Sequence, residues 1–481
     1  MTQNIELFRR EFRPLWQLAG PLILAEVGWV SMGIVDTVMV GRLSASAEAI
    51  GAVSLGSVLF HVVAIFGGGL LLGLDTLVSQ AFGARQVEDC HRSLLSGVYL
   101  SLFLGPVLMG FIWACLPLLN SFGIDPGVLS QSIPYLKAIT WSTVPLLLYF
   151  AFRRYLQGMS LVKPVMFSLV TANLVNVGAN WVLIFGHLGA PALGVEGAGW
   201  ATCFSRVYMA LVLLGYSLYH DRRHRTGLRR VPLRPQLDRV RRLVSLGWPA
   251  ALQFGLEVAV FAIVTALIGR LDPVWLAGHQ IALTAASFTY MVPLGVSSAA
   301  AVRVGQALGR GDAQGAGRSG WAALVLGAGF MSGAALAFLL VPHAIARIFT
   351  PDAAVIRAGA ALLAVAAFFQ LFDGLQAVAT GALRGAGDTR TPMASHLVSY
   401  WLLGLPLGYF LCFGRGWGAV GLWVGLCVAL ILIGSVLLLA WYRKAHRFSP
   451  LQPIADKLKH LILRWTGRDV RPPRPKVLLY L

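Results

Sequence analysis

Long apolar runs make up most of this sequence, and they limit the possible folds more than any other feature. A helix needs roughly 20 apolar residues to cross the hydrocarbon core of a bilayer, and Gly and Pro inside such a helix are tolerated. Runs of this kind lie at 14–41, 48–76, 93–119, 132–152, 164–187, 194–219, 243–268, 275–302, 319–345, 358–382, 392–413 and 417–442. The sequence therefore predicts an all-α polytopic membrane protein with twelve transmembrane helices.

The composition supports this class. Charged residues make up 12% of the 481 positions, against about 25% in soluble domains. A formal net charge of +19 could indicate nucleic-acid binding, but the Lys and Arg residues lie in short loops and in the tail. We therefore expect the lipid bilayer as a partner and no nucleic acid. The five cysteines lack a C-x-x-C spacing, so no disulfide or tightly bound metal is expected.

Basic residues predict the orientation in the membrane. Stretch 220–242 carries nine arginines, and alternate loops on the same side are also basic. By the positive-inside rule both termini are cytoplasmic. The first apolar run has no A-x-A-like cleavage site, so it is expected to stay as a span. In the tail, Ile454, Leu458, Leu461, Ile462 and Trp465 share one face of a predicted basic amphipathic helix on the inner leaflet.

The two halves of the chain repeat each other. Pro21 is followed twenty residues later by "GRL" (41–43), and Pro249 is followed by "GRL" (269–271) at the same distance. "SQAFGAR" (79–85) returns as "GQALGR" (305–310). Six spans in each half bring both halves into the membrane from the same side, which predicts two pseudo-symmetric six-helix bundles around a central cavity. The expected divisions are a terminus at 1–13, an N-lobe at 14–219, a linker at 220–242, a C-lobe at 243–442 and a tail at 443–481.

Acidic residues inside the apolar runs are the main functional candidates, because a charge in the bilayer is costly. With a helical rise of about 1.5 Å per residue, Glu257 and Asp373 both fall near mid-depth of the C-lobe. Burial and mutual repulsion favour a state in which such a pair holds a proton or a cation. Losing that proton or ion changes the local charge, which is what coupling an ion gradient to a conformational change requires.

Asp36 is the corresponding candidate in the N-lobe, in the outer part of its helix. Asn176 and Asn180 share one face of the fifth span, and Thr202 lies in the sixth. Their oxygens suit a small cation, or could partner a protonated acid. Two alternatives stay open: Asp36 could pair with Arg42 at the membrane boundary, and Asn and Thr could only join helices.

Two further acids are ambiguous. Glu26 could attract cations in the cavity or make a buried hydrogen bond, and Asp75 could serve a gate or a helix contact. No G-x-x-x-x-G-K-[ST], H-E-x-x-H or G-x-S-x-G motif occurs, so we do not expect an enzyme.

Several segments resemble one family. "PLILAEVGWVSMGIVDTVMVGRL", "MVPLGVSSAAAVRVGQALGRGD", "FQLFDGLQAVATGALRGAGDTRTP" and "YWLLGLPLGYFL" are similar to the multidrug and toxin extrusion (MATE) transporters, and within them to the NorM-type branch. The resemblance covers about residues 10–445. It implies a V-shaped pair of six-helix lobes in a bacterial inner membrane that exports cationic, amphipathic drugs and dyes in exchange for Na⁺ or H⁺. It implies no cofactor beyond the transported ion, and a monomer is expected.

The resemblance also assigns residues. The family's N-lobe aspartate falls on Asp36, its N-lobe ligands on Asn176, Asn180 and Thr202, and its C-lobe acidic pair on Glu257 and Asp373. Some members carry a second aspartate where this chain has Asn180, which argues against a proton relay there. Others carry a tyrosine where this chain has Phe369, which weakens the Na⁺ interpretation. The expected substrate-cavity residues are Glu26, Trp29, Gln253, Gln280, Phe288, Tyr290, Phe369 and Phe372.

Three other classes of membrane protein fit the sequence less well. A lipid-linked oligosaccharide flippase of the same superfamily needs a basic cavity for pyrophosphate, whereas the mid-depth charges here are acidic. A non-transporting scaffold gains nothing from unpaired acids inside the membrane. A major-facilitator transporter should carry a G-x-x-x-D-R-x-G-R-type loop after the second span, where this chain has "QAFGARQVEDCHR". The sequence therefore favours a cation-exporting antiporter and leaves Na⁺ and H⁺ open.

Overall fold

The computed structural model describes residues 2–43, 46–122 and 125–448. The predicted amphipathic helix at 454–465 lies outside them. Within the described residues eleven helical segments are long and apolar enough to span a membrane, and a helix pair bent by 47° makes a twelfth. Each predicted apolar run coincides with one of these segments, so the twelve predicted spans are confirmed.

The first half of the chain supplies six spans. They are α1 (Thr2–Val40), α2 (Ser46–Leu71) with α3 (Gly73–Gly83), α4 (Val87–Cys115) with a 3₁₀ turn (Leu116–Phe122), α5 (Pro126–Thr140) with α6 (Thr143–Gly158), α7 (Lys163–Phe185) and α8 (Val195–His224). The sequence did not predict the break at Trp141 and Ser142. There, the hydroxyls of Ser142 and Thr143 donate to carbonyls three residues earlier, a local bonding pattern that competes with regular helix.

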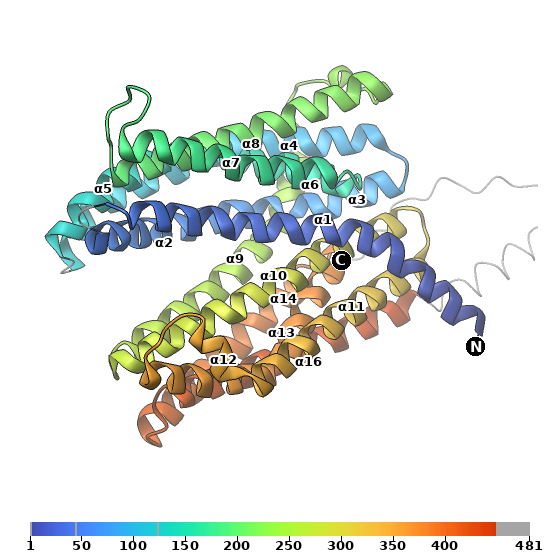
Figure 1. The fold of residues 1–481 in the computed structure, drawn as a ribbon. Coiled ribbons are helices and arrows are strands. Elements are labelled where there is room, and N and C mark those ends of the chain that lie inside the picture. The colour runs from blue at the N-terminus through green and yellow to red at the C-terminus, as the bar shows by residue number, and fades with distance from the viewer. Residues whose placement is uncertain (1, 44–45, 123–124, 449–481) are drawn as a thin grey trace, which may run out of the picture.

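The second half repeats this plan. Its elements are α9 (Leu237–Ile268), α10 (Pro273–Gly309), α11 (Ala313–Leu340), the short α12 (Pro342–Arg347), α13 (Ala353–Gly385), α14 (Arg390–His396) and α16 (Gly418–Phe448). Between α14 and α16, π-helical stretches Leu397–Gly404 and Phe410–Gly414 flank α15 (Leu405–Tyr409). In Figure 1, α4–α8 lie in the upper half of the molecule and α9–α16 in the lower half.

Helix α1 belongs to both lobes. Its residues Leu15 and Leu22 are buried in the hydrophobic core of the C-lobe, whereas Ala25 and Met32 are buried in that of the N-lobe. The change from packing in the C-lobe core to packing in the N-lobe core occurs just after Pro21, which lies inside the helix. Figure 1 shows α1 running between the two halves. Any relative motion of the lobes must therefore bend α1 or break one of these contacts.

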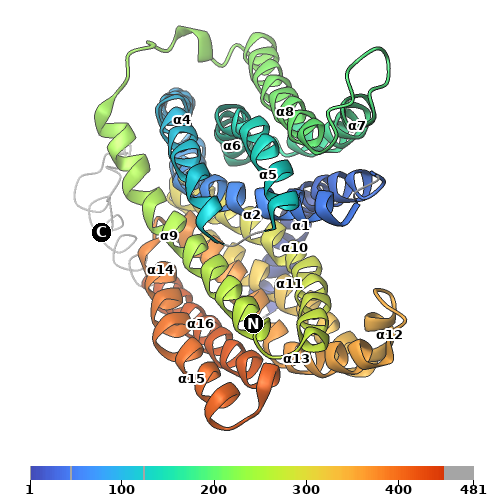
Figure 2. The ribbon, with the colours of Figure 1, turned by 90° about the vertical axis from the view of Figure 1, so that its left-hand side faces the viewer.

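The lobes pack closely at one end of the bundle. We call it the linker end, because it carries the connector 225–236 between α8 and α9, which Figure 2 shows arching from one lobe to the other. Gly247 of α9 touches α2 so closely that a Cβ there would collide with the Leu70 carbonyl, and Gly309 of α10 similarly abuts Gln80 of α3. Glycine permits this backbone approach, so Gly247 and Gly309 are packing contacts between the lobes.

Candidate functional site

Asp36 sits in a polar cluster formed by three helices of the N-lobe. Asn180 of α7 donates to one Asp36 carboxylate oxygen at 2.6 Å, and the Thr202 hydroxyl of α8 donates to the other at 2.7 Å. Asn180 also donates to the Asn176 side-chain oxygen at 3.1 Å. All four side chains are buried. The structure thus brings together the four residues that the sequence proposed for ion coupling in this lobe.

The cluster holds Asp36 by neutral donors. Arg42, the alternative partner, is exposed, and no ion pair joins it to Asp36 in the described structure. The Asn180 side-chain oxygen and the Asn176 amide nitrogen are buried without a hydrogen-bond partner. An unpaired buried polar atom is costly, so this cluster has capacity for a further partner.

A buried arginine lies one helical turn from Thr202. Arg206 donates to the Ser142 hydroxyl at 2.6 Å, and its guanidinium lies 4.5 Å from the centre of the Phe60 ring and 5.9 Å from that of Trp29. Among the described residues no carboxylate lies within ion-pair distance of it, but Asp36 is close enough to interact with it electrostatically. Sequence reasoning missed it, although an arginine inside the run 194–219 is the same signal that singled out the acids.

The C-lobe acids also share one region. Gln376, one turn after Asp373 on α13, donates to the Asp373 carboxylate at 3.2 Å. Glu257 of α9 lies close enough to interact electrostatically with Asp373, and Gln376 and Tyr290 lie beside both. Asp373 is buried, and the Glu257 side chain is 14% exposed. The two acids that the sequence expected to share a site therefore lie near each other.

His396 is a neighbour of this pair that the sequence did not indicate. Its Nδ1 lies 2.8 Å from the Pro392 carbonyl, and because a carbonyl can only accept, Nδ1 carries a hydrogen. The other nitrogen, Nε2, is 3.7 Å from the Glu257 carboxylate and 3.4 Å from the Gln253 amide nitrogen. No helix-position argument could find this contact, because residues 257 and 396 lie in different helices far apart in the chain.

The proposed cavity side chains differ widely in exposure. Phe288 is 62% exposed, and Gln280 is also exposed. Phe369 is buried and stacks on Trp423, and Gln253 is buried beside His396. The remaining aromatic candidates, Trp29, Tyr290 and Phe372, are partly buried.

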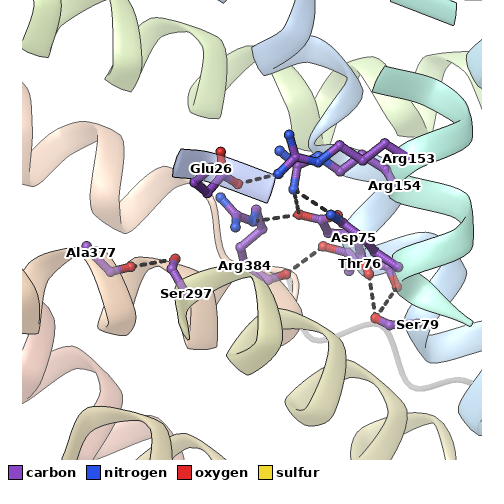
Figure 3. Close-up of polar contacts among 10 residues, drawn as sticks. Glu26, Asp75, Thr76, Ser79, Arg153, Arg154, Ser297, Ala377 and Arg384 are labelled. Carbon is purple, nitrogen blue, oxygen red and sulfur yellow. Dashed lines mark hydrogen bonds and ion pairs between the residues drawn. The ribbon is translucent and has the colours of Figure 1, made fainter. Parts of the chain in front are cut away.

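Asp75 lies where the two lobes meet at the linker end. Its carboxylate contacts Arg384 of α13 at 3.1 Å and Arg154 of α6 at 3.4 Å, so a C-lobe and an N-lobe arginine share it (Figure 3). The adjacent Thr76 donates to the Arg384 carbonyl at 2.5 Å, and Gln80 donates to that of Gly385 at 3.0 Å. We call the Asp75–Arg384 contact with these two hydrogen bonds the lobe latch.

Glu26 makes the buried contact that was one of its two alternatives. Arg153 of α6 donates to its carboxylate, and both side chains are almost fully buried (Figure 3). The pair joins α1 to α6 within the N-lobe. Arg153 and Arg154 directly follow the apolar run 132–152, so the sequence pattern alone does not indicate that they are buried.

We expect Arg153→Gln to destabilise the protein. The change leaves the Glu26 carboxylate buried without its counter-charge, and breaking a buried ion pair in this way costs about 3–5 kcal/mol. The midpoint of thermal unfolding of the detergent-purified protein should therefore fall, and the double variant Glu26→Gln/Arg153→Gln should recover part of the loss. An unchanged midpoint in Arg153→Gln would contradict this role.

The five acids that the sequence singled out therefore fall into two groups. Arginines neutralise Glu26 and Asp75. Asp36 and Asp373 accept hydrogen bonds from neutral side chains. In the described structure, the only basic side chain within ion-pair distance of Glu257 is that of His396. The described residues contain no group of three or more His, Cys, Asp or Glu side chains that could hold a metal ion.

This two-lobed arrangement of twelve spans defines a class of polytopic membrane proteins with an internal repeat. The MatE family model matches the chain twice, over residues 21–182 and 249–410. The chain belongs to the MatE family. The two matches have equal lengths, so position 21 corresponds to position 249 and position 182 to position 410. This correspondence confirms the repeat predicted from the Pro and Gly-Arg-Leu spacing.

Relatives span nearly the whole chain. A probable multidrug resistance protein NorM of Mesorhizobium japonicum is 35% identical over 452 residues, covering 92% of this chain and 96% of the relative. The multidrug resistance protein NorM of Photobacterium profundum is 34% identical over 428 residues, covering 88% and 93%. These matches confirm the resemblance to NorM-type proteins.

Solved structures share the fold. The eukaryotic MATE transporter AtDTX14 superposes with a TM-score of 0.82 at 22% identity, covering 92% of this chain and 98% of that one. An outward-facing multidrug resistance MATE family transporter also gives 0.82, at 17% identity with coverages of 91% and 97%. The two-lobed fold is therefore common to proteins of low sequence identity.

Proposed function

We propose that this protein is a multidrug efflux transporter, and more specifically a secondary antiporter that exports cationic amphipathic drugs and dyes in exchange for H⁺ or Na⁺. One observation carries the proposal. Among the described residues, each lobe holds a buried acidic site with no Lys or Arg within ion-pair distance, whereas Glu26 and Asp75 each have an arginine partner. A carboxylate inside a membrane with no counter-charge in direct contact favours binding of a proton or a cation.

The relatives support the substrate class. NorM proteins at about one-third identity carry the name multidrug resistance protein. Exposed aromatic side chains such as Phe288 could contact apolar, cationic molecules. The acids that bind the ion would also favour a cationic substrate over an anionic one.

Alternating access would work by separating the lobes at one end while they close at the other. The latch and the close glycine contacts between the lobes lie at the linker end. If the arginine-rich connector is cytoplasmic, as the positive-inside rule predicts, this conformation is closed toward the cytoplasm. In this scheme α1, which packs in both cores, would transmit ion binding at Asp36 to the C-lobe.

Transport of a fluorescent cationic dye in proteoliposomes tests the proposal. We expect an imposed pH gradient or an imposed Na⁺ gradient to drive dye against its concentration gradient, and an ionophore that dissipates the effective gradient to stop it. Comparing the two gradients also identifies the coupling ion. Dye movement that neither gradient accelerates would contradict antiport.

A further inference from the structure

A pocket in the N-lobe is lined by none of the residues to which the proposed transport cycle assigns a role. It has a volume of about 520 Å³ and lies where the end of α4 and the following 3₁₀ turn meet α5. Trp113, Asn120, Lys137 and Trp141 are among its lining residues. It lies toward the end of the bundle opposite the linker end, since α4 starts at Val87 on the linker side and reaches the pocket only in its last turn, at Trp113.

Lys137 is the unusual member of this pocket. It lies within the bent fourth span, close to the break between α5 and α6, and its side chain is exposed. In the part of the chain that the structure describes, no carboxylate lies within ion-pair distance of it. An exposed lysine within a membrane span is unfavourable unless its ammonium group reaches a polar or anionic partner.

The height of the pocket suits a lipid headgroup. With a helical rise of about 1.5 Å per residue, α4 rises about 39 Å between Val87 and Trp113, which exceeds the roughly 30 Å thickness of the hydrocarbon core. Trp113 and Trp141 are 39% and 52% exposed and pack edge to face at 5.6 Å. Tryptophan is enriched at the level where hydrocarbon gives way to headgroups.

An apolar stripe leads from the pocket toward the middle of the membrane. Leu102 and Pro106 of α4 precede the pocket residue Trp113 by eleven and seven residues, and both are exposed. Residues at these spacings share one helix face, so they form an apolar track of about 16 Å between Leu102 and Trp113. An acyl chain can lie along such a track.

The repeat shows that the fold does not require the cation of this pocket. Asp125 and Asp352 cap α5 and α13, which start at corresponding places in the two halves. Lys137 lies twelve residues after the first cap, and Ala364 lies twelve residues after the second. The C-lobe therefore builds the corresponding helix without a cation at this position.

We propose that this pocket binds an anionic phospholipid. Its headgroup phosphate would lie against the Lys137 ammonium and the Asn120 amide, and one acyl chain would follow the α4 stripe. An ammonium group is a suitable point charge for a phosphate, and the apolar track selects a lipid over a soluble anion.

Native mass spectrometry of the detergent-purified full chain tests the proposal. The protein is titrated with phosphatidylglycerol or with phosphatidylcholine carrying the same acyl chains. We expect tighter binding of phosphatidylglycerol, and Lys137→Gln should weaken it about fivefold while leaving phosphatidylcholine unchanged. Arg347→Gln, which removes an exposed cation from α12 in the other lobe, is the matched control and should change neither.

Three outcomes would overturn the assignment. Unchanged phosphatidylglycerol binding in Lys137→Gln would place the lipid elsewhere. Equal weakening by Arg347→Gln would indicate a general effect of net charge. Displacement of the lipid by millimolar inorganic phosphate would show that the pocket recognises a free anion. Because Lys137 is exposed, its replacement by glutamine should leave the fold intact, and an unchanged thermal midpoint verifies this.

Discussion

Replacing Asp36 by asparagine is expected to reduce gradient-driven dye efflux to the level of empty vesicles. Asparagine matches aspartate in shape and can still bond to Asn180 and Thr202, which contact both carboxylate oxygens at 2.6 and 2.7 Å. It cannot, however, release a proton or neutralise a cation. Uphill transport in proteoliposomes and thermal unfolding of the same preparation, measured together, separate loss of coupling from loss of fold.

Two further variants serve as comparisons for the loss of efflux in Asp36→Asn. Thr202→Val keeps the Asp36 charge but removes one donor, so we expect slower efflux that remains gradient-dependent. Glu88→Gln removes an exposed carboxylate that pairs with Arg92 within α4, and it should transport like the wild type, since exposed pairs contribute little. Wild-type uphill efflux in Asp36→Asn would remove Asp36 from the coupling mechanism.

Weakening the lobe latch is expected to open the linker end. Asp75 and Arg384 are both almost fully buried, and removing one partner of such a pair costs about 3–5 kcal/mol. Because Asp75 and Arg384 belong to different lobes and touch when the lobes are joined, part of that cost destabilises the joined conformation alone. Asp75→Asn should therefore shift the population toward separated lobes and slow efflux, because the transporter would no longer close readily.

Pulsed electron–electron double resonance measures the distance between two spin labels and can therefore detect this shift. Arg85 and Arg310 are exposed, follow α3 and α10 at the linker end, and lie in different lobes. Labels at these positions, in a chain whose native cysteines are replaced, should show a longer distance in Asp75→Asn than in the wild type. Glu88→Gln again serves as the control. An unchanged distance distribution in Asp75→Asn would show that the latch does not hold the lobes together.

The predictions that succeeded concern properties of single helices and of the repeat. Apolar runs predict spans because bilayer thickness sets a minimum helix length, and each run coincides with a span. The Asp36 cluster could be proposed because Asn176 and Asn180 share one helix face. The depth argument similarly placed Glu257 beside Asp373.

The partners of the other acids could not be predicted in this way. Arg384 is far from Asp75 in the sequence and belongs to the other lobe, and only the packing of the two lobes brings them together. His396 reaches Glu257 from a different helix. Helix periodicity states which residues share a face but not which faces meet, so such contacts require the tertiary structure.

Helix α1 illustrates the same limit. By its position in the sequence it belongs to the first repeat, and its apolar pattern is continuous. The structure divides it between the two cores near Pro21. Hydrophobicity alone does not distinguish a side chain that packs in one lobe from one that packs in the other.

The acids without an arginine partner are proposed to couple dye transport to ion transport. The ion flux that a dye gradient drives is the most direct test of this coupling. Proteoliposomes with no imposed ion gradient are given an outward dye gradient, and H⁺ and Na⁺ movement is recorded for the wild type, Asp36→Asn and Glu257→Gln. We predict that dye drives an opposite flux of one of these ions in the wild type and that the flux is lost in both variants. Dye-driven ion flux that persists at the wild-type level in both variants would contradict the account.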